Sequence, residues 1–147
     1  KELFNFFKEY VSKYKKTIDK SKEADLIKSM NFLKNKAKTL EDIWNNAQYI
    51  INDKIKINDG DKELINDLSK KVIQDFISEY EKLSTLSREV LEPVIKSLID
   101  KHKTNFKGVG QPLRIALVGS RFGPGLYDVI LSLKKEEVIK RLKLMIS

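Results

Sequence analysis

The residue types that most often perform catalysis are almost absent from this 147-residue sequence. There is no cysteine, which excludes a thiol nucleophile, a disulfide framework and a zinc ribbon. His102 is the single histidine, so a metal site built from several histidines is excluded. A lone histidine at a charged helix end is expected to be a solvated surface residue. The sequence therefore predicts no metal site and no cysteine-based chemistry.

Two further patterns resemble catalytic motifs without their spacing. Residues 119–121 read Gly-Ser-Arg, which is not a nucleophile elbow, and the glycines that follow lack the Gly-Lys-Ser/Thr of a phosphate-binding loop. Glu136 and Glu137 stand at the start of a predicted helix, where carboxylates complement the positive end of the helix dipole. We therefore expect no catalytic and no cofactor-binding residue, and no enzymatic activity from this chain alone.

The chemistry that the sequence favours is the binding of polyanions. Lysine and arginine number 29 against 21 acidic residues, which gives a formal net charge of +8. A positive field attracts nucleic acid and anionic lipid alike, so charge does not choose between them. A planar guanidinium can form paired hydrogen bonds to a base edge, whereas an ammonium acts as a point charge. Specific recognition is therefore expected among the four arginines, Arg88, Arg114, Arg121 and Arg141.

Helices must position these side chains, because apolar residues recur at spacings of three and four along most of the chain. Apolar residues form 41% and charged residues 34% of the sequence, as in a packed helical protein. No apolar run approaches the roughly 18 residues of a membrane-spanning helix. Helices are expected at residues 3–14, 26–33, 39–51, 64–80, 90–99, 112–118, 125–133 and 136–146.

Several residues mark where these helices begin, end or bend. Thr39 and Asp42 have the spacing of an N-terminal cap, and Pro93 must lie in the first turn of its helix or kink it. Pro112 suits the first position of a short helix and Gly119 its C-terminal cap, which we prefer to a lone strand at this place. An Asn-Asp-Gly turn signal ends at Gly60. The fold class is therefore all-α, a helical bundle of two small subdomains, residues 1–59 and 60–147.

The expected core of the first helix and the character of the last one complete this picture. The first helix should bury a broad apolar face, made of Leu3, Phe6, Phe7, Tyr10, Val11 and Tyr14. The last helix and the two residues before it carry basic residues that we expect to form a solvated face and to steer phosphates, namely Lys134, Lys135, Lys140, Arg141 and Lys143.

Two segments carry a resemblance to a known family. Residues 111–130 read QPLRIALVGSRFGPGLYDVI, and residues 33–51 read LKNKAKTLEDIWNNAQYII. The first closely resembles the C-terminal signature of bacterial glutamyl-tRNA synthetases, and the second is similar to the Ala-Lys-Thr-Leu helix start of that family. The resemblance implies an all-helical, cage-type anticodon-binding region. The two ATP-binding signatures of class I synthetases are missing, so a catalytic domain is expected N-terminal to Lys1.

The resemblance also implies which residues contact RNA. Arg114, Gly123, Pro124 and Leu126 match positions that line the surface where anticodon bases are splayed, and Lys36, Arg121 and Phe122 are possible further tRNA contacts. Unstacked loop bases are the usual target of sequence-specific RNA binding. Three positions depart from the family pattern: Gly123 stands where Thr or Ser is common, Lys36 where arginine is frequent, and Lys134 where the family has Gly before the last helix. The alternative for Arg114 is that it only caps or bridges helices.

The resemblance thus implies an anticodon-binding fragment of a glutamate–tRNA ligase that holds the anticodon arm of tRNA-Glu. The parent enzyme would join glutamate to tRNA with ATP and magnesium, in the cytoplasm and as a monomer. One alternative is a basic helical protein–protein scaffold without RNA specificity. Another is a peripheral membrane bundle, which would need a helix with an apolar stripe facing solvent beside lysines. No predicted helix requires that arrangement, because a bundle core explains each apolar stripe equally well.

Overall fold

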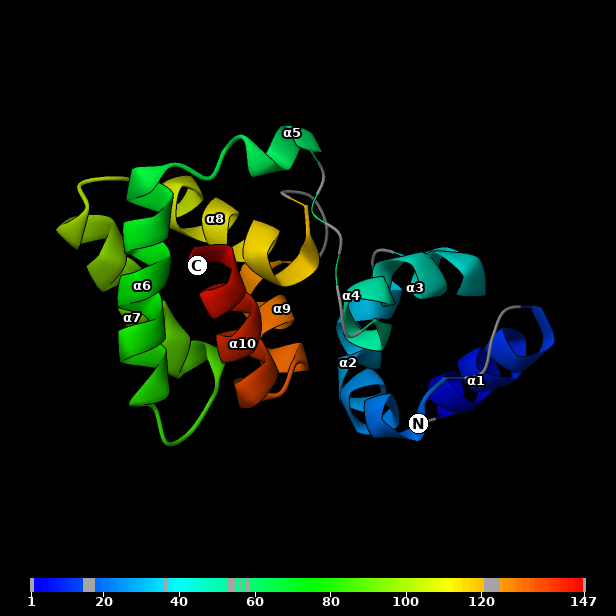
Figure 1. The fold of residues 1–147 in the computed structure, drawn as a ribbon. Coiled ribbons are helices and arrows are strands. Elements are labelled where there is room, and N and C mark those ends of the chain that lie inside the picture. The colour runs from blue at the N-terminus through cyan, green and yellow to red at the C-terminus, as the bar shows by residue number, and fades with distance from the viewer. Residues whose placement is uncertain are drawn as a thin grey trace. The chain divides into compact units, whose positions relative to one another are not determined.

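The computed structural model describes residues 2–14, 18–35, 37–52, 55, 57, 59–120 and 125–146. All regular elements in these residues are helices, as the all-α prediction requires (Figure 1). The chain forms two compact units, Lys1–Lys54 and Ile55–Ser147. This division lies a few residues before the Gly60 boundary expected from the turn signal.

In its described residues, the N-terminal unit contains four α-helices and one short 3-10 helix. They are α1 (Glu2–Tyr14), η1 (Lys20–Lys22), α2 (Glu23–Asn35), α3 (Leu40–Asn46) and α4 (Gln48–Ile51). Helix α1 packs against both α2 and α3. The apolar side chains buried in this unit are Phe4, Phe7, Val11, Ile18, Leu26, Met30, Leu33, Ile43, Ala47, Tyr49 and Ile50.

The face that α1 buries differs from the expected one. Phe4, Phe7 and Val11 form the buried stripe, whereas Phe6 is 57% exposed. A helix turns by about 100° per residue, so Phe6 cannot share a narrow stripe with Phe4 and Phe7. The expectation that Phe6 belongs to the core was wrong, because α1 presents more apolar residues than its two neighbours can cover.

The cap predicted at Thr39 is confirmed in atomic detail. The Thr39 hydroxyl accepts the Asp42 backbone N–H at 3.1 Å, and the Asp42 carboxylate accepts the Thr39 N–H at 3.2 Å. The pKa of the Asp42 carboxyl lies below its usual value, chiefly because the carboxylate also accepts the Lys38 N–H. The two bonds with Thr39 lower this pKa further. The single helix expected over residues 39–51 is interrupted at Ala47, and the Gln48 side chain donates to the Trp44 carbonyl at 2.8 Å.

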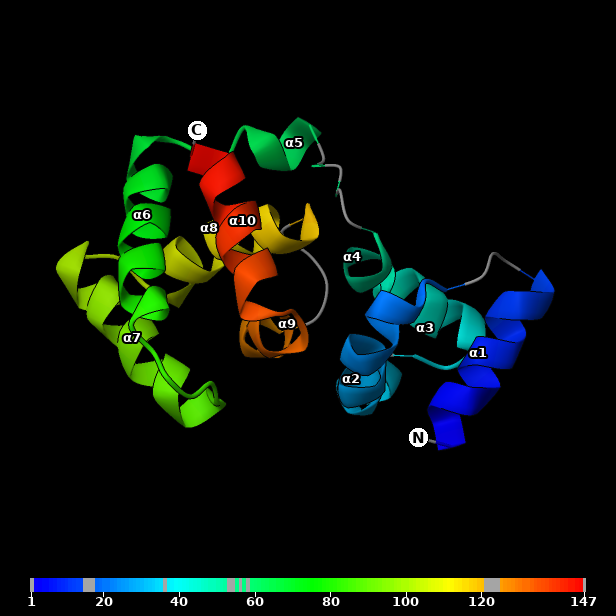
Figure 2. The ribbon, with the colours of Figure 1, turned by 60° about the horizontal axis from the view of Figure 1, so that its bottom comes forward.

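The C-terminal unit contains six helices among the residues that the structure describes, and α8 packs against most of them. They are α5 (Asp59–Lys62), α6 (Asp67–Glu81), α7 (Arg88–Lys101), α8 (Phe106–Val118), α9 (Leu126–Ser132) and α10 (Lys135–Ile146). Helix α8 packs against α6, α7, α9 and α10, and both ribbon views show it surrounded by them (Figures 1 and 2). Most of its side chains are therefore buried, including Val109, Leu113, Ile115 and Leu117.

Polar caps determine where the helices of this unit begin. The side-chain amide oxygen of Asn66 accepts the Ser69 N–H at 2.9 Å, so α6 begins at Asp67 and leaves Leu68 45% exposed. The helix therefore begins three residues after the start expected at residue 64. Ser87 caps α7 in the same way, and Pro93 lies inside that helix, past its first turn.

Helix α8 is longer than the predicted helix at residues 112–118. Asn105 accepts the Gly108 N–H at 2.9 Å and starts the helix at Phe106, so Pro112 lies in the interior and not at the first position. Because proline has no N–H, the Gly108 carbonyl receives no intrahelical bond from it. The predicted end is confirmed: Gly119 adopts a left-handed φ of 92°, and its N–H donates to the Ile115 carbonyl at 2.8 Å.

Candidate nucleic-acid interface

Arg114 lies on the face of α8 that meets the start of α9. Phe106, Gly110 and Arg114 are spaced by four residues and so share this face. The Arg114 side chain is half-buried, and burial lowers the pKa of its guanidinium. It remains a cation at neutral pH, because the ordinary pKa of arginine is above 12. Burial leaves a side chain fewer rotamers than an open surface does, so this cation has less conformational entropy to lose on binding.

Gly110 allows α9 to approach this face closely. A Cβ atom at Gly110 would lie 3.3 Å from Phe106 Cε1 and 3.4 Å from Leu126 Cδ2. The Leu126 side chain is only 2% exposed, so it belongs to the core between α8 and α9. Of the predicted contact residues, Leu126 can therefore offer RNA its backbone, at the first position of α9, but not its side chain.

The remaining predicted contacts lie outside the described residues. These are Lys36, Arg121, Phe122, Gly123 and Pro124. The structure describes the residues on either side of positions 121–124, including the left-handed Gly119 at the end of α8 and Gly125 before α9. Leu126 packs at Gly110, so the start of α9 lies against the middle of α8. Gly125, directly before Leu126, therefore lies on the side of α8 that carries Arg114.

Arg141 is a structural residue, contrary to the solvated role expected from the sequence. It is 4% exposed, its Nη1 donates to the Leu117 carbonyl at 2.7 Å, and its Nε donates to Glu137 at 2.9 Å. Lys135 likewise donates from Nζ to the carbonyls of Glu81 and Leu83, at 3.1 and 2.6 Å. Both cations therefore satisfy carbonyls at helix ends, which otherwise lack intrahelical partners.

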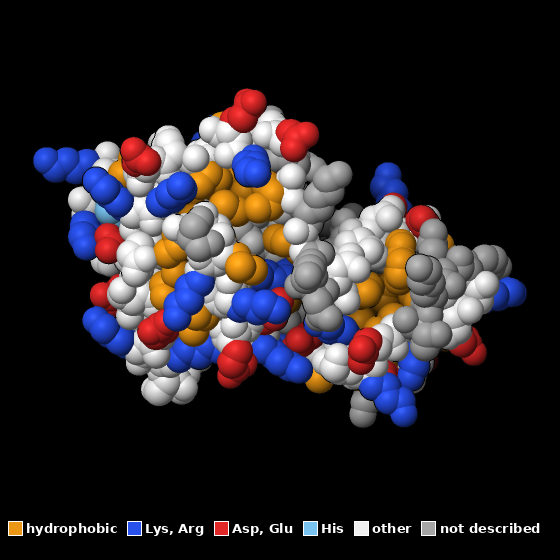
Figure 3. Space-filling model, viewed as in Figure 1, with side chains coloured by type: hydrophobic (Ala, Val, Ile, Leu, Met, Phe, Trp, Pro, Cys, Tyr) orange, Lys and Arg blue, Asp and Glu red, His pale blue; other side chains and the backbone are white. Residues whose placement is uncertain are grey.

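The other basic residues of the last helix do lie at the surface. Lys140 and Lys143 are exposed, and Lys143 is 3.6 Å from a Glu81 oxygen. On the face of the C-terminal unit that Figure 3 shows, lysine and arginine side chains alternate with acidic ones and do not form one stripe. Positive charge on this face is thus suited to weak attraction of phosphates from many directions.

His102 is also buried more than the sequence suggested. Its side chain is 11% exposed and its Nε2 lies 2.8 Å from Asp75 Oδ2, while Lys101 Nζ lies 3.0 Å from the same oxygen. The prediction of a solvated histidine was wrong, because α6 brings Asp75 against the end of α7. Burial acts to raise the Asp75 pKa, but the hydrogen bonds from Lys101 and His102 outweigh it and the pKa is lowered.

An aromatic cluster near Arg114 was not recognised from the sequence. Phe106 is 44% exposed, and its ring lies 6.1 Å from that of Tyr127, centroid to centroid, at a tilt of 44°. The Arg88 guanidinium lies 4.8 Å from the Tyr127 centroid and donates to Glu92 at 2.8 Å. Two features of the sequence could have indicated this cluster: the helical spacing between Phe106 and Arg114, and the position of Tyr127 directly after Leu126.

This cluster borders a hollow of about 660 Å³. Its lining comes from α7 and from the two aromatic residues, and consists of Glu89, Glu92, Pro93, Ile95, Lys96, Ile99, Phe106 and Tyr127. Burial, and then the Glu92 charge, raise the pKa of Tyr127 against the opposing effect of Arg88. The phenol therefore remains neutral at physiological pH and can act as an aromatic wall.

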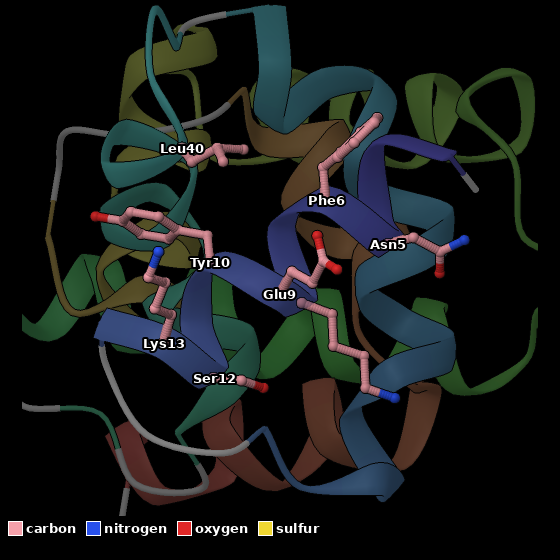
Figure 4. Close-up of a pocket in the computed structure, with 8 residues that line it drawn as sticks. Asn5, Phe6, Glu9, Tyr10, Ser12, Lys13 and Leu40 are labelled. Carbon is pink, nitrogen blue, oxygen red and sulfur yellow. The ribbon is translucent and has the colours of Figure 1, made fainter.

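The N-terminal unit has a separate, shallow hollow of about 820 Å³ along α1. Figure 4 shows Phe6 and Tyr10 projecting from α1, with Leu40 of α3 between them in this view. The Tyr10 hydroxyl donates to the Glu41 carboxylate, which fixes this ring against α3. The lining of this hollow mixes apolar, amide, hydroxyl and charged groups, and charges of one sign do not predominate in it.

In the described part of the chain, no group of three or more His, Cys, Asp or Glu side chains could hold a metal ion. Among the same residues, no helix combines the length and apolar character needed to cross a membrane.

Comparison with known proteins identifies the fold and the family. The family model for the anticodon binding domain matches residues 2–146. The chain belongs to the anticodon-binding domain family. This membership confirms the resemblance that residues 33–51 and 111–130 indicated.

Two curated relatives of this anticodon-binding domain show how much of a longer protein it represents. It is 55% identical over 141 residues to the glutamate–tRNA ligase of Pelagibacter ubique (strain HTCC1062), which covers 96% of this chain and 30% of that protein. It is 29% identical to the glutamate–tRNA ligase of Bradyrhizobium diazoefficiens, covering 88% of this chain and 27% of that protein. The chain thus spans about a third or less of the relatives it matches.

A solved structure agrees with the anticodon-binding fold. A glutamate tRNA ligase from Elizabethkingia meningosepticum, crystallised with its amino acid, superimposes with a TM-score of 0.81 and covers 99% of this chain and 28% of that protein. The sequence identity is 20%, so this likeness concerns the fold. It confirms the all-α, anticodon-binding architecture expected from the sequence.

Proposed function

We propose that this domain binds the anticodon arm of tRNA-Glu as part of a glutamate–tRNA ligase. The single observation that carries the proposal is the 55% identity to the Pelagibacter ubique ligase across nearly the whole chain. In the parent enzyme a catalytic domain would join glutamate to tRNA with ATP and magnesium. We assign no residue of this chain to ATP or magnesium. The parent is proposed to act as a monomer in the cytoplasm.

Arg114 is the residue proposed to read an anticodon base. Its half-buried cation lies on the α8 face that meets the start of α9. A guanidinium restrained in this way can stack on an unpaired base or donate to its edge with little loss of side-chain entropy. The proposed partners are the backbone of Gly123, Pro124 and Leu126, with Lys36, Arg121 and Phe122 as further contacts.

Most of the affinity should come from phosphate contacts made by exposed lysines. If four to six phosphates are neutralised, log K should fall with log salt at a slope of roughly −3 to −5, from about 0.7–0.9 per contact. Specificity should come separately, from base contacts near Arg114.

A titration against RNA stem-loops tests the proposal. The chain is titrated at several salt concentrations against the tRNA-Glu anticodon stem-loop and against one with a scrambled anticodon. We expect salt-sensitive binding to both and tighter binding to the cognate loop. Equal affinity for the two loops, or a salt slope near zero, would favour the alternative of a basic protein–protein scaffold.

A further inference from the structure

We propose that Phe106, supported by Tyr127, is a stacking platform for one unpaired base of the bound RNA loop. This inference rests on the proposed function and extends it to a second place on the domain. The platform borders the hollow of about 660 Å³ on α7, which is large enough for a nucleobase. No family position carried over from the sequence includes Phe106 or Tyr127.

The exposure of Phe106 is the first reason. A phenylalanine at the start of a helix that is otherwise mostly buried leaves 44% of its surface to solvent. The Tyr127 ring meets it at a tilt of 44°, and Arg88 covers Tyr127 from 4.8 Å. The tilted contact braces Phe106 without covering all of it. Stacking on an exposed aromatic ring is the commonest way for proteins to hold a single-stranded base.

The position of Phe106 relative to Arg114 is the second reason. The two residues are eight positions apart on one face of α8, or about 12 Å along the helix axis at 1.5 Å per residue. Tyr127 follows Leu126, which packs at Gly110 between them. One RNA loop can therefore contact Arg114 and Phe106 together, so the proposed platform continues the proposed anticodon surface.

The charges around the hollow favour a base over a phosphate. The charged residues of the lining are Glu89, Glu92 and Lys96, and Arg88, which lies next to the lining, is 2.8 Å from Glu92 and offsets its charge. A rim without net charge gives little attraction to phosphate oxygens, whereas carboxylates can accept from the exocyclic amine of a base. An apolar peptide is the competing occupant. The net charge of +8 and the continuity with Arg114 favour RNA.

The test compares variants with matched exposure. Phe106→Ala removes the ring, Phe106→Leu keeps apolar volume without a π-face, and Phe106→Tyr restores the ring. Leu68→Ala is the control, since Leu68 is 45% exposed on α6 of the same unit. Each variant of the chain is titrated with the tRNA-Glu anticodon stem-loop after its thermal unfolding has been compared with wild type.

We expect Phe106→Ala and Phe106→Leu to weaken binding by about tenfold, the scale of one lost base stack. Phe106→Tyr and Leu68→Ala should stay within about twofold of wild type. Replacing each loop base in turn by an abasic residue should reveal one position whose loss weakens wild type but not Phe106→Ala, because the two changes remove the same contact.

The outcomes separate this inference from the function on which it rests. If wild type prefers the cognate loop but Phe106→Ala behaves like Leu68→Ala, the platform is disproved and the proposed function stands. If Phe106→Leu keeps full affinity, the contact is apolar packing and stacking is disproved. If wild type shows no preference for the cognate loop, both proposals fall.

Discussion

Arg141 Nη1 donates to the backbone oxygen of Leu117 at 2.7 Å, which ties the last helix to the end of α8. The same side chain pairs with Glu137 at 2.9 Å, so the buried cation has a carboxylate as well as a carbonyl acceptor. Gly119, the C-terminal cap of α8, follows two residues after Leu117. The bond therefore fixes the C-terminal end of α8 against α10.

Replacing Arg141 should destabilise the C-terminal unit. Arg141→Met leaves the Glu137 carboxylate and the Leu117 carbonyl without this donor in a buried setting, and we expect the free energy of unfolding to fall by about 2–4 kcal/mol. Urea unfolding followed by circular dichroism measures the loss. Lys140→Met, an exposed change on the same helix, should cost no more than about 0.5 kcal/mol. Equal losses in the two variants would contradict the structural role of Arg141.

Removing the Tyr80 hydroxyl should leave stability unchanged or raise it. Tyr80 is fully buried, its ring stacks on Phe76 at 5.3 Å, and within the described residues its hydroxyl has no hydrogen-bond partner. Tyr80→Phe keeps the ring and removes a desolvated polar group, so its free energy of unfolding should match or exceed that of wild type. Tyr80→Ala should cost about 3–5 kcal/mol, since it opens a cavity. A large loss for Tyr80→Phe would mean that the hydroxyl is bonded.

The same hydroxyl predicts a loss of stability at alkaline pH. Burial, with a contribution from Glu136, raises the Tyr80 pKa to about 12 from the ordinary value of 10.0. Between these values the unfolded chain loses a proton that the folded chain keeps, so stability falls as pH rises from about 10 to about 12. Across this range, the free energy of unfolding should fall less steeply with pH for Tyr80→Phe than for wild type. Parallel slopes would show that Tyr80 does not contribute.

Asp75 predicts a loss of stability at acid pH. In the folded chain the Asp75 pKa lies below the usual 3.8. The stability that this carboxylate contributes is therefore complete above pH 3.8 and is lost as the pH falls from 3.8 toward the folded pKa. Asp75→Asn removes the charge that faces Lys101 and His102, and its stability should depend less on pH between about 5 and 2. Asp100→Asn, an exposed change on α7, serves as the control. An unchanged acid slope in Asp75→Asn would contradict the ion-pair assignment.

Arg114→Ala should weaken binding to the cognate anticodon stem-loop by about 1–3 kcal/mol, as expected for one stacked or paired base contact. Arg114→Lys should recover little of this, because an ammonium neither stacks nor forms paired bonds. Lys140→Ala should cost less than about 1 kcal/mol on every stem-loop, since a phosphate contact carries no sequence information. If folded Arg114→Ala loses affinity equally for cognate and scrambled loops, Arg114 supports the fold or contacts the RNA backbone.

The sequence by itself determined the features that depend on neighbours along the chain. The Thr39–Asp42 cap and the left-handed end of α8 at Gly119 involve residues three or four positions apart, and both were correctly predicted. The all-α class follows equally from local periodicity. Family membership was recoverable because residues 111–130 retain a specific order of residues in one continuous segment.

Only the tertiary structure decided which residues are buried and which long-range partners meet. Arg141 reads as a surface cation by its neighbours, yet it bonds to Leu117, 24 residues away; His102 bonds to Asp75, 27 residues away. Phe4 rather than Phe6 enters the core, because the packing of α2 and α3 selects one stripe of an apolar helix. Helical periodicity fixes which residues share a face, but burial depends on which helix covers that face, and this is set by packing across the whole unit.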